Sequence, residues 1–117
     1  MKTTTKIALT SVGLLLATTL SQAAATASAS DNWDNNCTKC HGADGKGLTP
    51  VGKKLQLKDY TDAKVQAALK DEDIVKAITD GVKDKDGKER MKSFKADLSD
   101  AEIKDLVAYV RKFKPKA

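Results

Sequence analysis

The pattern of apolar and polar positions predicts a first helix over residues 31–41. Trp33, Cys37 and Cys40 stand at positions i, i+4 and i+7, so an α-helix places the indole and both thiols on one face. The side chains with the most distinctive chemistry in this segment are therefore grouped on a single side of the predicted helix.

Three further segments have helical spacing. Residues 59–70 and 71–81 each carry an apolar stripe, and Gly81 is a typical C-terminal cap for the second of them. The strongest pattern follows Ser99, which forms a capping box with Glu102 and precedes apolar residues at helical spacing. We expect a long C-terminal helix from this point.

The segments between these helices are polar or rich in glycine. Residues 42–54 hold four glycines and a proline, which favours a loop. Residues 83–90 have no apolar side chain and include the turn-forming pair Asp86 and Gly87, so we expect a solvated loop. Because no segment alternates apolar and polar residues over the length of a strand, the pattern predicts an all-α domain of about four short helices.

The N-terminus has the organisation of a secretory signal peptide. Lys2 and Lys6 precede an apolar stretch over residues 7–20, and a run of Ala, Ser and Thr follows. An uncleaved membrane anchor is the alternative interpretation. It is less favoured because Thr and Ser dilute an apolar stretch that is already short of the ~20 residues that a membrane span needs.

Cleavage by a signal peptidase requires small residues, and Ala-x-Ala sequences end at Ala25, Ala27 and Ala29. We predict cleavage after Ala29. The chain then consists of a signal peptide over residues 1–29 and one domain over residues 30–117, and we expect the mature protein in the periplasm.

Composition describes a soluble globular domain with little core material. The 117 residues include 21 Lys and Arg against 16 Asp and Glu, the mean hydropathy is −0.45, and only five residues are aromatic. Loss of the predicted signal peptide lowers the net charge from +5 to +3. Two cysteines exclude a scaffold with several disulfides. A cofactor with apolar surface would therefore help so small a domain to fold.

Cys37, Cys40 and His41 form a C-x-x-C-H motif, the attachment sequence of c-type haem. Two thiols three positions apart can bond to the two vinyl groups of one haem, and the adjacent imidazole can bind the iron. Three alternatives use the same residues: a thioredoxin-like dithiol, a structural disulfide and a zinc site. The lack of a βαβ pattern disfavours the first, and the lack of a further ligand pair disfavours the last.

Residues 30–117 contain one histidine and one methionine. His41 therefore has no second imidazole to oppose it within the chain. Met91 follows 50 residues later in a polar segment between Arg90 and Lys92, where no apolar stripe requires a core methionine. We predict that Met91 is the distal ligand of the haem iron and His41 the proximal one.

The sequence CTKCHGADGKG, the methionine ahead of the last helix and the C-terminal sequence LSDAEIKDLVAYVRKF resemble the class I c-type cytochromes, particularly the small bacterial monohaem members. The resemblance covers the whole mature chain. It implies an exported carrier of one electron with a single covalent haem c, and no enzymatic turnover. It also implies that the first and last helices cross and bring Trp33 and Cys37 towards Leu106, Tyr109 and Val110.

The resemblance further implies that the carbonyl of Pro50 accepts a hydrogen bond from the His41 imidazole and so fixes the ring. Lys92 follows Met91 where many relatives have proline. A less rigid methionine segment favours an alternative function, a haem-based ligand-binding or sensor protein with a labile or open sixth position. The apolar residues expected around the haem are Val51, Leu55, Leu57, Leu69, Ile74, Ile78, Phe94 and Leu98.

The basic residues suggest a class of partner. We expect redox proteins as partners, no nucleic acid because acidic residues interleave with the basic ones, no stable membrane anchor, and a monomer. A ring of lysines can steer a carrier to an acidic partner, although the same lysines can simply keep the domain soluble. The lysines that flank the motif segments are Lys39, Lys46, Lys53, Lys54, Lys92 and Lys95.

Overall fold

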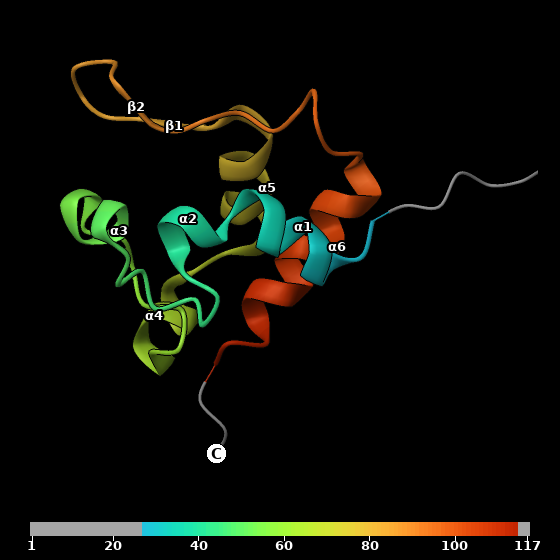
Figure 1. The fold of residues 1–117 in the computed structure, drawn as a ribbon, viewed down its shortest axis with the longest axis horizontal. Coiled ribbons are helices and arrows are strands. Elements are labelled where there is room, and N and C mark those ends of the chain that lie inside the picture. Colours follow the sequence, from blue (N-terminus) through green and yellow to red (C-terminus); the bar gives the residue numbers. More distant parts are fainter. Residues whose placement is uncertain (1–26, 115–117) are drawn as a thin grey trace, which may run out of the picture.

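A computed structural model describes residues 27–114, which form six helices and one antiparallel pair of short strands (Figure 1). The fold is all-α, as predicted, with more and shorter helices than expected. In chain order the elements are α1 (Ala29–Asn36), α2 (Thr38–His41), α3 (Pro50–Leu55), α4 (Ala63–Ala68), α5 (Asp71–Asp80), β1 (Val82–Lys83), β2 (Glu89–Met91) and α6 (Asp100–Arg111).

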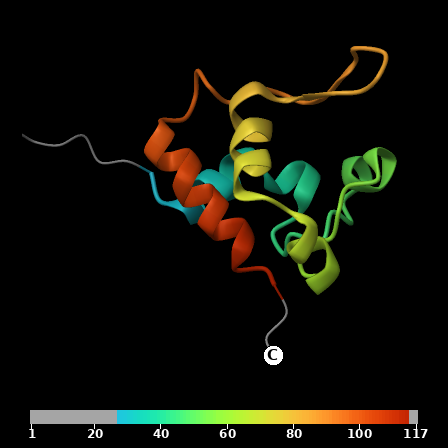
Figure 2. The ribbon, with the colours of Figure 1, turned by 180° about the vertical axis from the view of Figure 1, so that it is seen from behind.

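The core lies where α1, α5 and α6 meet. Helices α1 and α6 cross, and α5 packs along α6 on the other side (Figures 1 and 2). Trp33 is only 2% exposed, and its ring centroid lies 5.5 Å from that of Tyr109 and 5.0 Å from that of Phe113. The predicted crossing of the first and last helices is confirmed. The buried apolar residues are Trp33, Ile74, Ile78, Phe94, Leu98, Ile103, Leu106, Val107 and Val110.

Capping residues define the ends of the helices that were predicted. At α6, Ser99 and Glu102 form the expected capping box. At α4, Asp62 accepts a hydrogen bond from the backbone N–H of Lys64. Gly81 ends α5 with φ of +76°, a conformation that glycine adopts without strain.

The first predicted helix is divided in two. Cys37 has φ of −116° and ψ of −34°, and it separates α1 from the single turn of α2. Helix α3 lies inside the segment expected to be a loop. Its start has a readable signal, since Thr49 caps the helix and Pro50 occupies the first position, where no N–H is needed.

The segment at 83–90 is a hairpin rather than a simple loop. Asp84 accepts hydrogen bonds from the N–H groups of Asp86 and Lys88, and Gly87 turns the chain with φ of +77°. Strands β1 and β2 then pair Val82 with Met91. Figure 1 shows the hairpin extending from the helical body. Strands of two and three residues are too short to produce a recognisable alternation.

The predicted signal peptide falls mostly outside the described residues. Its last three positions are described: Ala27 precedes the helix, Ser28 caps α1 by accepting from the N–H of Asp31, and Ala29 is the first residue of that helix. None of the helices in residues 27–114 is long and apolar enough to cross a membrane.

Candidate functional site

The C-x-x-C-H motif forms the short helix α2 and the turn that follows it. The loop after the motif folds back onto it, because the N–H of Gly47 donates to the carbonyl of His41 at 2.8 Å. The hydroxyl of Thr49 donates to the carbonyl of Cys40 at 2.6 Å. The last two carbonyls of the motif, which would otherwise lack helical partners, are therefore satisfied by nearby residues.

Close backbone packing makes this arrangement rigid. A Cβ added at Gly52 in α3 would press on the carbonyl oxygen of Gly47 and lie 2.6 Å from that of Cys40. The N–H of Tyr60 donates to the carbonyl of Gly45 at 2.9 Å. Residues 42–60 thus wrap around the motif and hold it from one side.

The His41 imidazole has two aromatic neighbours. Tyr60 stacks on it with centroids 5.4 Å apart and planes 21° apart, and Trp33 lies at 5.7 Å with a 40° tilt. The indole N–H of Trp33 donates to the carbonyl of Gly42 at 3.0 Å. Burial lowers the pKa of His41 below its ordinary 6.5, which keeps the ring neutral, the form that binds a metal.

The hydrogen bond predicted between His41 and Pro50 is not formed. Within residues 27–114, Nδ1 of His41 is buried and has no hydrogen-bond partner. Pro50 is exposed as the first residue of α3, where its carbonyl belongs to the hydrogen-bonding pattern of that helix.

Two adjoining cavities, of about 110 and 410 Å³, open beside the motif. Both are lined by Cys37 and His41 from the motif and by Met91 from β2, and Cys40 lines the larger one. A mostly apolar wall with a few convergent polar groups is typical of a cofactor site. Residues that line both cavities are Cys37, His41, Tyr60, Leu69, Ala77 and Met91.

The sequence predicted much of this wall. Six of the expected apolar residues line a cavity: Leu55, Leu57, Leu69, Ile74, Ile78 and Phe94. Val51 and Leu98 do not, and Leu98 instead packs in the core. Tyr60, Ala77 and Val82 were not predicted. Tyr60 stands at the edge of a polar segment, where no periodicity marks it as inward-facing.

The segment after Met91 is held by hydrogen bonds to backbone carbonyls at the end of α5. The N–H of Phe94 donates to the carbonyl of Ile78 at 2.9 Å, and the hydroxyl of Ser93 donates to that of Thr79 at 2.6 Å. Both acceptors lie at the end of α5. These bonds explain how a polar, largely exposed segment can place one thioether at the edge of the core.

Arg90, the residue before Met91, donates to the carbonyl of Leu55 in α3 at 2.6 Å. Lys92, the residue after it, places its ammonium 4.7 Å from the Phe94 ring centroid and 3.3 Å from the carboxylate of Asp97. The hairpin is thereby joined to α3 across the larger cavity.

Cys37 and Cys40 are free thiols in this structure. Burial, with a smaller contribution from Cys40, raises the pKa of Cys37 to about 11. A catalytic dithiol needs the opposite shift, towards the thiolate. In the described part of the chain, no group of three or more His, Cys, Asp and Glu side chains is arranged to hold a metal ion. Two thiols, a neutral imidazole and a thioether around an apolar cavity fit a haem better than a zinc ion or a reactive dithiol.

Comparisons with known proteins point to one class of haem protein. Residues 24–110 match the family described as cytochrome C oxidase, cbb3-type, subunit III. The chain is 33% identical over 83 residues to cytochrome c-554(548) of Halomonas halodenitrificans, which covers 71% of this chain and 90% of that relative.

Two solved structures are similar to this chain at 34% sequence identity. The KustC0563 c-type cytochrome matches with a TM-score of 0.65 and covers 75% of this chain and 99% of its own. A mutant of the same protein matches with a TM-score of 0.63 and covers 75% and 100%.

Proposed function

We propose a function for this chain on the premise that it belongs to the c-type cytochromes, the family shared by the matched profile, the curated relative and the solved structures. Proteins of this family hold haem c on a C-x-x-C-H motif and take part in electron transfer. The proposal is an exported carrier of one electron. Cys37 and Cys40 anchor a single haem c, His41 and Met91 are its axial ligands, and the protein turns over no substrate of its own.

One observation carries the proposal: His41 and Met91, which come from distant parts of the chain, line the same two cavities. When bound, haem c supplies an iron that alternates between the ferrous and ferric states. His41, kept neutral by burial, provides an imidazole nitrogen, and Met91 provides a thioether. The apolar wall excludes water and disfavours the extra charge of the ferric state, so it raises the reduction potential.

The alternative is a haem-based ligand-binding or sensor protein with a labile or open sixth position. It is favoured by the construction of the hairpin, because β2 has three residues and Met91 pairs with a single partner, Val82. An axial ligand on so short a ribbon could be displaced by a small molecule. The two functions differ in whether Met91 stays on the iron in the resting protein.

The test is the visible spectrum and midpoint potential of holoprotein exported from a host with haem-attachment machinery. The carrier predicts a sharp reduced α band and, in the oxidised protein, a weak far-red sulfur-to-iron band. Met91→Ala should keep the covalent haem, abolish the far-red band and lower the potential. Lys85→Ala, at an exposed residue in the turn of the same hairpin that lines neither cavity, is the control and should keep the band.

A covalent but high-spin haem in the unaltered protein would favour the ligand-binding alternative. Absence of covalent haem would overturn both functions. An unchanged spectrum and potential in Met91→Ala would remove Met91 from the axial position.

We also propose export to the periplasm through the signal sequence in residues 1–29. The mass of the exported protein tests this. Cleavage after Ala25 or Ala27 retains the α1 cap at Ser28, whereas the predicted cleavage after Ala29 removes it. Retention of the full 117-residue mass would contradict the proposal.

We further propose that the partners are redox proteins with acidic docking surfaces. The six lysines that flank the motif segments are all exposed, and one of them, Lys92, also lines the larger cavity. The rate of electron transfer should fall as salt rises, because screening weakens attraction between exposed charges. A rate independent of ionic strength would leave these lysines as solubilising groups.

A further inference from the structure

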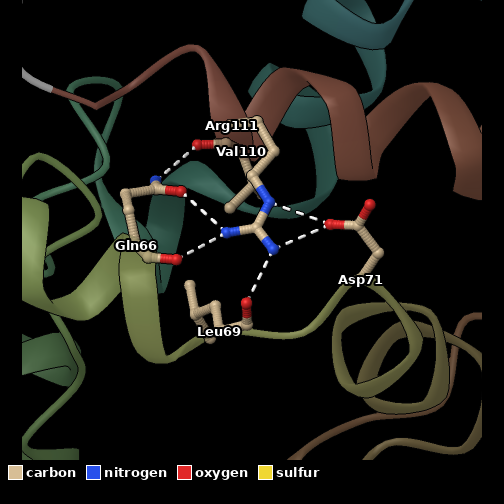
Figure 3. A network of polar contacts seen from close by, with 5 residues as sticks. All are labelled: Gln66, Leu69, Asp71, Val110 and Arg111. Atoms are coloured by element: carbon tan, nitrogen blue, oxygen red, sulfur yellow. Dashed lines mark hydrogen bonds and ion pairs between the residues drawn. The ribbon is translucent and has the colours of Figure 1, made fainter.

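A buried side-chain amide joins the C-terminal helix to the backbone of Tyr60, the residue whose ring stacks on His41. Gln66 in α4 is only 9% exposed. Its Nε2 donates to the carbonyl of Tyr60 at 2.7 Å and to that of Val110 in α6 at 2.9 Å (Figure 3 shows the Val110 bond). The amide therefore bridges two segments that are far apart in the sequence.

Arg111 fixes the orientation of this amide. One of its terminal nitrogens donates both to the backbone carbonyl of Gln66 at 2.8 Å and to its Oε1 at 3.1 Å (Figure 3). The other donates to the carbonyl of Leu69 at 2.7 Å and lies 2.8 Å from a carboxylate oxygen of Asp71. Because a guanidinium can only donate, the amide oxygen must face it, and the NH₂ group must face Tyr60 and Val110.

Tyr60 is consequently held at both of its backbone polar groups. Its carbonyl accepts from Gln66, and its N–H donates to Gly45 in the loop that follows the C-x-x-C-H motif. With the backbone fixed at both ends, the phenol ring lies over the His41 imidazole, 21° from parallel. The position of Tyr60 therefore depends on Gln66.

His41 depends in turn on its ring neighbours. A histidine that binds a metal is usually oriented by a hydrogen bond from its other ring nitrogen. In residues 27–114 Nδ1 of His41 has no hydrogen-bond partner, and contacts with two neighbouring aromatic rings contribute to the orientation of the imidazole. Trp33 is tilted by 40° and Tyr60 is the more nearly parallel neighbour.

We propose that Gln66, locked by Arg111, is a positioning residue for His41: it holds Tyr60 so that the stacked phenol sets the plane of the axial imidazole. The inference rests on the proposed function, since it concerns His41 as an iron ligand. It assigns a role in the haem site to a network that lies outside both cavities.

The experiment compares oxidised holoproteins by proton NMR. The shifts of the haem methyl groups depend on the direction of the axial imidazole plane, which a merely structural role for Gln66 would not alter. Gln66→Met keeps the length of the side chain and removes its hydrogen bonds. We expect it to redistribute the methyl shifts, and Tyr60→Leu to change them in the same sense.

Asp71→Asn is the matched control. It weakens the ion pair with Arg111 but leaves the bonds of Gln66 in place, so the methyl pattern should stay unchanged while stability falls slightly. If Gln66→Met yields no folded holoprotein, Gln66→Asn provides a shorter amide that cannot span the same distance, and the same redistribution is expected.

Methyl shifts that stay unchanged in Gln66→Met and Gln66→Asn would overturn the inference and leave Gln66 as a purely structural residue. Redistribution in Asp71→Asn of the same size would also overturn it. Failure of the proposed function is distinguishable, because the unaltered protein would then lack the spectrum of a histidine-ligated haem.

Discussion

The two walls of the cavity are built in different ways. On the His41 side, α1, α2 and residues 42–60, which include α3, are packed through buried rings and carbonyls satisfied by close neighbours. On the Met91 side, a hairpin with mostly exposed side chains reaches the cavity from the end of α5. One wall is part of the core, and the other is attached to it.

The difference separates two properties of the site. Under the proposed function, attachment of a haem to Cys37 and Cys40 would depend on the rigid wall, which the core supports directly. Retention of Met91 as a ligand of the iron would depend on a few backbone contacts beside Gly81. Substitutions in the first region should therefore destabilise the whole fold, whereas substitutions in the second should release Met91 from an otherwise intact protein.

The largest effect is expected for Trp33→Ala. The substitution removes a ring that is 2% exposed and contacts both His41 and α6, and it leaves the carbonyl of Gly42 without its donor. Burial losses of this kind cost about 3–5 kcal/mol. Urea unfolding of the holoprotein, followed by circular dichroism, measures it. A loss below about 1 kcal/mol would show that the crossing of α1 and α6 does not depend on this ring.

Gly81→Ala tests the attached wall and should have the next largest effect. Gly81 has φ of +76°, and a Cβ there would lie 2.6 Å from the carbonyl oxygen of Met91 and 2.8 Å from the nitrogen of Ser93. The extended backbone with positive φ at Gly81 costs a residue with a side chain about 1–3 kcal/mol, and overpacking adds about 1–3 kcal/mol. The far-red band assigned to Met91 ligation should weaken while helicity persists.

Gly87→Ala is the matched control for this comparison. Gly87 has nearly the same φ, +77°, but a Cβ there meets no atom within 4 Å. It should carry only the backbone cost, about 1–2 kcal/mol, which falls on the hairpin turn, and leave the far-red band in place. Equal loss of the band in both variants would mean that conformation, not contact with Met91, holds the hairpin.

The same division explains which parts of the structure could be predicted from the sequence. Helix α6 is marked by its own residues, since the Ser99 capping box and the apolar stripe are local signals. Helix α3 has a local signal too, in Thr49 and Pro50, but four glycines nearby suggested a loop. The hairpin has a local signal only for its turn, in Asp86 and Gly87, and none for its strands, which are too short to show alternation and depend on backbone contacts with α5.

The contacts around His41 lie beyond local signals. The stack of Tyr60 on His41 joins residues 19 positions apart, and the bond from Gln66 to Val110 joins residues 44 positions apart. Such pairs arise from the packing of whole helices, so spacing along one segment cannot predict them. The motif predicts which atoms are available to a haem, and the tertiary fold decides how they are oriented.

Ser99→Ala should have a smaller effect, of about 1 kcal/mol, typical for loss of an N-cap. Ser99 accepts from the N–H of Glu102 at the start of α6 and holds the Glu102 side chain, which also binds Asn32 of α1. Unfolding by urea should shift while the far-red band stays unchanged, because the change lies in the core region. Loss of the band would show that the start of α6 also supports the hairpin.

The smallest effect is expected from titration of Glu102. The side-chain hydrogen bond from Asn32 at 2.8 Å, followed by bonds from the N–H and hydroxyl of Ser99, lowers the pKa of Glu102 below its ordinary 4.5. A lowered pKa in the folded state means that the ionised carboxylate stabilises the fold above about pH 4.5, and that this contribution disappears as pH falls through the folded pKa. Glu102→Gln keeps an acceptor for the capping box but cannot titrate.

The unaltered protein should therefore be more stable than Glu102→Gln at pH 6, and the difference should shrink as the pH falls below about 4.5. Urea unfolding of both proteins across this range measures the change, which is small because the carboxylate is solvent-screened. A difference independent of pH would mean that the geometry of the bond to Asn32, rather than the charge, joins α1 to α6. Since this junction lies in the core region, the far-red band of Met91 should not follow the same titration.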